Sequence, residues 1–242
     1  FSPPPPAPRY LALGGGLGLV LMSPVEMGGW GARARVGLGP GRARAVWAEI
    51  RGLHGKIGNI PASEVTFWID EDPPYRMHLQ GKVDERSFYG AALQLDTALS
   101  MTSGSPTLSL TDRIANRGAE PQEYEIIYHG NFGPPLLEDG ASMVAAVRRV
   151  QPMNQEASKS IHRFNRFTGP TPGQKEHVFL IQPLSDPDGD TTVLLQNAAK
   201  TLGCSMHYSL ESLPFLTLWV NLAPRQSGYV VGIEPGTNYP FN

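Results

Sequence analysis

Two side chains in the sequence could exchange protons with a substrate. His129 follows the apolar residues 126–128 in the stretch IIYHGNFGPPL, and Glu234 follows the apolar run 230–233 in GYVVGIEPG. A histidine that titrates near neutral pH and a carboxylate are common choices for a general acid and a general base. Each residue also has a plainer interpretation, His129 as a structural histidine at a strand end and Glu234 as a solvated residue at the rim of a sheet. Catalysis requires that the fold brings the two together.

A third polar segment, GLHGKIGNIPA at residues 52–62, places His54, Lys56 and Asn59 among glycines. Glycine lets the backbone approach a ligand closely, so this segment is a candidate binding loop. It could equally be a turn between two strands, in which case the histidine has no role.

The remaining strong patterns predict strands and no long helix. The segments AALQLDTALSM and TLSLTDRIANRG flank the turn TSGSP. In the second of them one face carries Leu108, Leu110, Asp112 and Ile114, which predicts a hairpin. Residues 151–174 predict a long ordered loop because of the prolines and glycines in FTGPTPGQ. The stretch DPDGD lacks the further ligands of a calcium loop and predicts a plain hairpin turn. The fold class is therefore all-β.

Length and composition exclude several classes of protein. The chain has 242 residues, which fits one β-sandwich domain, and its net charge of −2 offers no basic stripe for nucleic acid. It contains no run of about 18 apolar residues, so no membrane span is expected. The single cysteine, Cys204, excludes an internal disulfide framework and a cysteine-rich metal site. One cysteine fits a reducing compartment and also a secreted protein.

Residues 1–45 differ from the rest of the chain because Gly, Pro, Ala and Arg dominate them. We expect this atypical segment to be either a poorly ordered leader or an aberrant N-terminus. The domain that follows is expected at residues 46–242.

Four segments, in order along the chain, resemble one known family. They are LHGKIGNIPA, DRIANRGAEPQEYEIIYHGNFGPPLLEDGA, LPFLTLWVNL and GYVVGIEPGTNYP. Together they resemble the DUF4432 family of the galactose mutarotase-like (aldose 1-epimerase) superfamily, over about residues 46–242. The resemblance implies an antiparallel β-supersandwich with a sugar cleft, incomplete or irregular at its N-terminus.

The resemblance also implies roles for individual residues. His129 matches the catalytic histidine of the superfamily, and Glu234 matches the glutamate that serves as general base. Lys56 stands where relatives commonly have arginine, so a point charge would replace a bidentate contact. The residues expected to bind the sugar are His54, Lys56, Asn59, Asn131, Trp219 and His177.

The function implied is that of an aldose 1-epimerase-like isomerase, cytoplasmic, which interconverts sugar anomers by acid and base catalysis. We expect a small carbohydrate as its partner, no nucleic acid or membrane, and no metal or organic cofactor. A glutamate near its usual pKa would accept the proton of the C1 hydroxyl, and a histidine kept protonated by nearby carboxylates would donate to the ring oxygen. A carbohydrate-binding protein without turnover, and a sugar lyase or hydrolase, are the alternatives, because a fold does not fix a function.

Overall fold

The computed structural model describes residues 57–88 and 90–239. The segment 1–45, its boundary with the following domain, and the side chains of His54 and Lys56 lie outside the described residues. Asn59 closes the 3-10 turn η1 (Ile57–Asn59), of which only the backbone is described at that position. The chain divides into two compact units, whose described parts are residues 57–88 with 90–123 and residues 124–239, and each is presented by itself.

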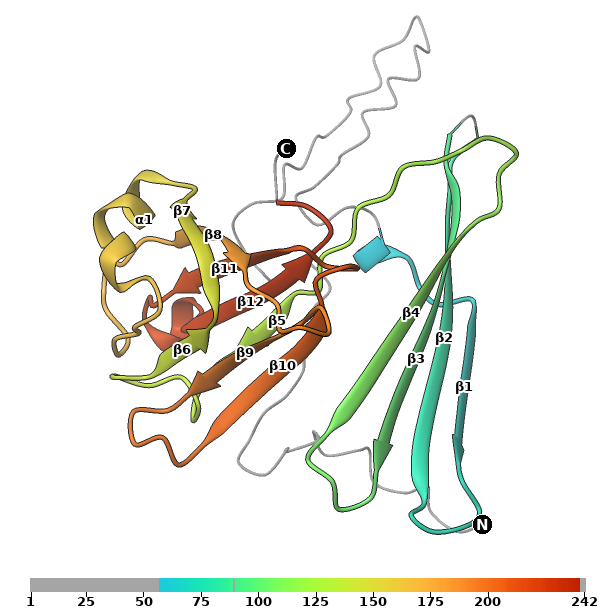
Figure 1. Cartoon of the computed structure of the whole chain (residues 1–242), viewed down its shortest axis with the longest axis horizontal. Helices are drawn as coiled ribbons and strands as arrows, with labels where there is room; N and C mark the ends of the chain where they lie inside the picture. The colour runs from blue at the N-terminus through green and yellow to red at the C-terminus, as the bar shows by residue number, and fades with distance from the viewer. Residues whose placement is uncertain (1–56, 89, 240–242) are drawn as a thin grey trace, which may run out of the picture. The chain divides into compact units, whose positions relative to one another are not determined.

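The first unit is a four-stranded antiparallel sheet with the order β1-β2-β3-β4, visible in Figure 1 as strands in sequence order. Its strands are β1 (Glu64–Ile69), β2 (Arg76–Arg86), β3 (Ala92–Thr102) and β4 (Leu108–Asn116). The alternation in the sequence places apolar side chains on one face, where one row runs across all four strands through Phe67, Leu79, Leu99 and Leu110. The predicted hairpin of β3 and β4 is confirmed.

The second unit contains two antiparallel sheets. One has the order β10-β9-β6 and the other the order β5-β12-β11-β8-β7. The strands of the first are β6 (Ser142–Ala145), β9 (Asp190–Gln196) and β10 (Gly203–Ser209). Those of the second are β5 (Gly130–Phe132), β7 (Val147–Pro152), β8 (His177–Pro183), β11 (Phe215–Asn221) and β12 (Val230–Gly236).

The hydrophobic core of this unit lies between its two sheets. The five-stranded sheet contributes Phe179, Ile181, Leu216, Leu218, Val231 and Ile233, and the other sheet contributes Met143, Val193 and Leu195. All of these side chains are at most 1% exposed. Because side chains alternate along a strand, the residues between them must point to the opposite face of the five-stranded sheet.

That opposite face, which we call the site face, carries polar groups. It comprises Asn131 on β5, Gly232 and Glu234 on β12, Thr217 and Trp219 on β11, and Val178 and Leu180 on β8. The register aligns them in rows. One row contains Glu234, Thr217 and Leu180, and the next contains Asn131, Gly232, Trp219 and Val178. One face of the sheet therefore packs in the apolar core, and the other carries Asn131, Thr217 and Glu234 beside apolar side chains.

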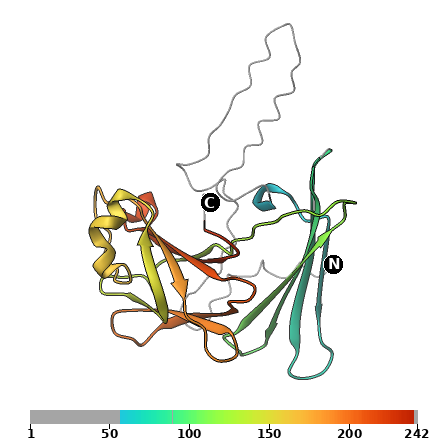
Figure 2. The same ribbon diagram turned by 45° about the horizontal axis from the view of Figure 1, so that its top comes forward.

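Two local expectations differ from the structure. The DPDGD turn joins β8 to β9, which belong to different sheets, so it is not a hairpin turn. The segment 151–174 contains a short helix, α1 (Gln155–Ser160), followed by the 3-10 turn η2 (Ile161–Arg163). Asn154 caps α1 by accepting a hydrogen bond from the backbone N–H of Ala157 (2.8 Å), a role to which asparagine is suited. Figures 1 and 2 show α1 beside β7 and β8.

The all-β antiparallel class expected from the sequence is confirmed, since the sheets are antiparallel and the helical elements of the described residues are all short. Within residues 57–88 and 90–239, no helix has the length and apolar character needed to cross a membrane.

Candidate active site

His129 is held against β12 by backbone contacts on both sides of it. Ile127 forms an isolated bridge with Gly236, and the N–H of Tyr128 donates to the carbonyl oxygen of Pro235 (2.9 Å). Strand β5 begins immediately afterwards, at Gly130. His129 therefore precedes a strand that pairs with β12, whereas the sequence pattern placed it at the end of a strand.

Glu234 lies inside β12, directly opposite Thr217 on β11. Its side chain is only 5% exposed, so the interpretation as a solvated residue at the rim of a sheet is wrong. Pro235 continues the strand opposite Leu216 and does not end it. The carboxyl group thus sits on a central strand whose position is fixed by neighbours on both sides.

The imidazole and the carboxyl group meet at short range. Nε2 of His129 lies 3.0 Å from Oε1 of Glu234, and His129 is the more exposed partner, with 18% of its side chain accessible. The distance is that of an ion pair, but the angles are not those of a hydrogen bond, and Oε1 has no hydrogen bond to any described residue. The two groups are therefore within ion-pair distance without a hydrogen bond between Nε2 and Oε1.

Burial changes the acidity of this carboxyl group. Loss of hydration raises the pKa of Glu234 from 4.5 to about 8, because the charged form is the one that water stabilises most. A protonated His129 beside it acts in the opposite direction. The sequence-based expectation of a glutamate near its usual pKa is therefore not met, and Glu234 is a stronger base than an ordinary carboxylate.

Gly232 makes room for the pair. A Cβ atom at this position would overlap Oε1 of Glu234 and would lie 3.2 Å from Cε1 of His129. Since a methyl group is already too large here, the absence of a side chain is what allows Glu234 and His129 to meet.

Two further residues predicted to bind sugar flank Gly232 on the site face. Trp219 lies opposite Gly232 on β11, with its ring centroid 5.9 Å from that of His129 and the planes at 65°, an edge-to-face contact. Asn131 lies opposite Gly232 on β5, and its Oδ1 is buried without a hydrogen bond to any described residue. The structure therefore brings together His129, Glu234, Trp219 and Asn131.

Comparison with known proteins places the chain in a family. The family described as "Domain of unknown function (DUF4432)" matches residues 34–242. The chain belongs to this family. Among solved structures, the chain is similar to the crystal structure of a putative aldose 1-epimerase from Klebsiella pneumoniae subsp. pneumoniae MGH 78578, with 41% identity and a TM-score of 0.76. The match covers 78% of this chain and 49% of that one, so the chain spans about half the length of that protein. No curated protein matches.

These likenesses agree with a galactose mutarotase-like β-sandwich for the DUF4432 chain. They also place the His129–Glu234 pair within the matched part of the family, since residues 34–242 include both.

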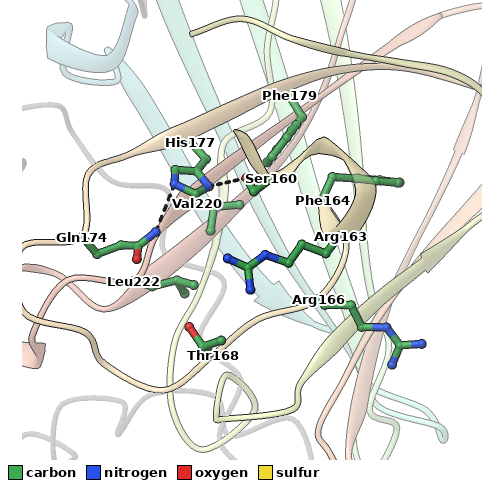
Figure 3. Close-up of a pocket in the computed structure, with 10 residues that line it drawn as sticks. All are labelled: Ser160, Arg163, Phe164, Arg166, Thr168, Gln174, His177, Phe179, Val220 and Leu222. Atoms are coloured by element: carbon green, nitrogen blue, oxygen red, sulfur yellow. Dashed lines mark hydrogen bonds between the residues drawn. The ribbon is translucent and has the colours of Figure 1, made fainter. Parts of the chain in front are cut away.

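His177 is the predicted sugar-binding residue that the structure places elsewhere. It lies opposite Val220, and it shares the core-facing side of β8 with Phe179 and Ile181. Gln174 donates its amide N–H to Nε2 (3.0 Å), and Nδ1 lies 2.9 Å from Oγ of Ser160, as Figure 3 shows. Burial lowers the pKa of His177, which favours the neutral ring. This histidine therefore lies on the other face of the sheet from Glu234, and it is not brought together with the four residues above.

One residue of the site face was missed by the sequence analysis. Thr217 is 2% exposed, lies opposite Glu234, and has no hydrogen bond from its Oγ1 to any described residue. The available signal is its spacing from Trp219 in LTLWVN, because residues two apart on a strand share a face.

The residues described do not form a metal site. Within residues 57–88 and 90–239, no group of three or more His, Cys, Asp and Glu side chains could hold a metal ion.

Proposed function

We propose that this DUF4432 protein is a sugar isomerase that interconverts the α and β anomers of an aldose. The observation that carries the proposal is the 3.0 Å contact between Nε2 of His129 and Oε1 of the buried Glu234. The description of the similar solved protein as a putative aldose 1-epimerase supports the same reaction class.

The reaction requires one acid and one base at adjacent oxygen atoms. Glu234 takes the proton of the C1 hydroxyl, the electron pair of that O–H bond forms the C1=O bond, and the C1–O5 bond breaks. His129 gives its proton to O5, which leaves an open-chain aldehyde. Rotation about C1–C2 and reversal of the steps produce the other anomer. Each such partner contributes typically ~10²–10⁴-fold to the rate.

The geometry suits this chemistry because O1 and O5 are bonded to the same carbon atom. An acid and a base in mutual contact can therefore reach both oxygens when the sugar lies across them. The reactive form has the proton on His129 and an ionised Glu234. The raised pKa of Glu234 lies closer to a neutral working pH than that of an ordinary carboxyl group, so its carboxylate accepts the proton of the C1 hydroxyl more favourably.

Trp219 and Asn131 extend the surface on which a sugar would lie. The indole offers an apolar platform for the C–H face of a sugar ring. The buried Oδ1 of Asn131 would accept a hydrogen bond from a sugar hydroxyl, which removes the cost of leaving that atom unpaired.

The test is the rate of anomer exchange, measured by polarimetry or NMR saturation transfer with fresh α-glucose, α-galactose and a broader panel of aldoses. Wild type should accelerate exchange and Glu234→Gln should not. Equal rates for the two proteins across the panel would refute the proposal. Binding of sugars without exchange would favour a carbohydrate-binding protein, and new products would favour a lyase or hydrolase.

A further inference from the structure

Three buried polar atoms of the site face lack hydrogen bonds within the described part of the chain. They are Oε1 of Glu234, Oδ1 of Asn131 and Oγ1 of Thr217. Buried polar atoms are nearly always paired in folded proteins, because an unpaired one costs the free energy of its lost hydration. Three of them on three adjacent strands, all directed to one face, indicate that a polar ligand completes their hydrogen bonds.

Of these three residues, Thr217 lies directly beside Glu234 on the neighbouring strand. It is the cross-strand partner of Glu234, so their Cβ atoms are about 5 Å apart. Neither side chain hydrogen-bonds to the other, since both Oγ1 and Oε1 remain unpaired among described residues. One ligand oxygen between them can bond to both.

We infer that the hydroxyl of Thr217 binds the anomeric oxygen, O1, of the sugar, and that it is a catalytic residue in the reaction proposed above. This inference rests on that proposed function. The sugar O1–H donates to Oε1 of Glu234, and the O–H of Thr217 donates to a lone pair of the same O1. The ligand class is thus an aldose with a free anomeric hydroxyl, and a glycoside with an alkylated O1 would lack the proton that Glu234 removes.

The chemistry gives this hydroxyl a role in the rate as well as in binding. When Glu234 removes the proton, negative charge develops on O1 before the C1=O bond is complete. A donor fixed at that oxygen stabilises the charge where it forms, and removing one such donor lowers kcat by about 10²–10³-fold in enzymes with a strong oxyanion. The charge on O1 is partial here, so we expect a loss of about 10–100-fold.

A purely structural threonine would behave differently, and the chain contains one. Thr191 on β9 is 5% exposed, and its Oγ1 donates to the carbonyl oxygen of Leu184 (2.9 Å). Replacement of this residue by valine removes a hydrogen bond that the fold uses. The same replacement at Thr217 removes a hydroxyl that the fold leaves unpaired, while the shape of the side chain and its preference for a strand are kept.

The experiment measures anomer exchange and thermal unfolding for Thr217→Val, Thr217→Ser and Thr191→Val. Thr217→Val should lose about 10–100-fold in kcat with an unchanged or higher Tm, and Thr217→Ser should keep a rate within about threefold of wild type because it retains the donor. Thr191→Val should lower Tm and leave the rate unchanged.

The outcomes separate this inference from the function on which it rests. Full activity of Thr217→Val would overturn the role of Thr217 and leave the proposed function intact. A slow Thr217→Val whose Tm falls as in Thr191→Val, without rescue by Thr217→Ser, would also overturn it, because the loss would follow from the fold. Absence of exchange by wild type on every aldose would refute the proposed function itself.

Discussion

Two histidines at the five-stranded sheet differ in how the polar atoms around them are hydrogen-bonded. His177, on the core-facing side of β8, has a hydrogen-bonding neighbour at each ring nitrogen, Ser160 and Gln174. His129 lies at the start of β5 against a buried carboxyl group, and nearby side chains on the site face include oxygen atoms without hydrogen bonds to described residues. Burial alone does not distinguish the two histidines. What distinguishes His129 is that side chains near it have unpaired oxygen atoms among the described residues, and this is why we propose His129 as the acid.

The comparison is tested most strongly by making the same substitution at both histidines. His129→Asn should reduce the rate of anomer exchange by about 10²–10⁴-fold, because the proton donor is lost. His177→Asn should leave the rate within about twofold of wild type and lower the free energy of unfolding by about 1–3 kcal/mol, since it disturbs buried hydrogen bonds. Anomer exchange by NMR and urea unfolding of both variants give the two numbers. Similar rate losses in both would remove the distinction.

The buried carboxyl group should make stability depend on pH. The pKa of Glu234 is raised from 4.5 to about 8 in the folded chain, so its contribution is fully present below pH 4.5 and is lost as the pH rises through 8. Glu234→Gln cannot ionise. Its free energy of unfolding should match wild type near pH 4 and exceed it by about 2–4 kcal/mol near pH 9, at about 1.4 kcal/mol per pKa unit less the stabilisation by His129.

Urea unfolding of both proteins at several pH values measures this difference. A difference that stays constant between pH 5 and pH 9 would mean that the carboxyl group does not change its ionisation in that range.

Substitution of Gly232, which leaves room for the contact between Glu234 and His129, is expected to have a smaller effect on the rate. Gly232→Ala should lower the rate by about 10–100-fold, because the methyl group pushes Glu234 and His129 out of position. Gly133→Ala is the matched control, since a Cβ there would meet only the carbonyl oxygen of Tyr229 at an ordinary 3.7 Å. The control should retain the wild-type rate. An active Gly232→Ala would show that the contact between the pair is not needed.

The smallest effect is expected at the helix that supports His177. Asn154→Ala removes the cap of α1 and should cost about 1 kcal/mol in the free energy of unfolding. Because α1 lies on the side of the sheet away from Glu234, the rate of anomer exchange should not change. A clear loss of rate would indicate that the two faces are coupled.

Local patterns were sufficient to predict much of the fold. The hairpin of β3 and β4 follows from alternation and a short turn, which involve neighbouring residues only. The prediction of a hairpin turn at DPDGD was wrong, because a turn sequence does not determine whether the next strand stays in the same sheet. The interpretation of Glu234 as a rim residue was wrong because β12 continues through Pro235 to Gly236.

The site depended on information that no local pattern contains. His129 and Glu234 meet through pairing of distant segments, and the resemblance to a family identified the pair where periodicity could not. Thr217 was missed because its significance arises from the register of β11 against β12. The position of His177 could have been predicted, since it alternates with Phe179 and Ile181, two typical core residues.

The position of Glu234 inside β12 also helps to determine the register in which this strand pairs with its neighbours. A slip of β12 by one residue would turn every side chain of the strand to the other face, so that Ile233 would leave the core and the carboxyl group would enter it. A carboxyl group in an apolar core is strongly disfavoured. The residue that weakens the native state at high pH therefore also penalises the misregistered alternatives, so that the proposed catalysis and the alignment of the strand place the same demand on one position.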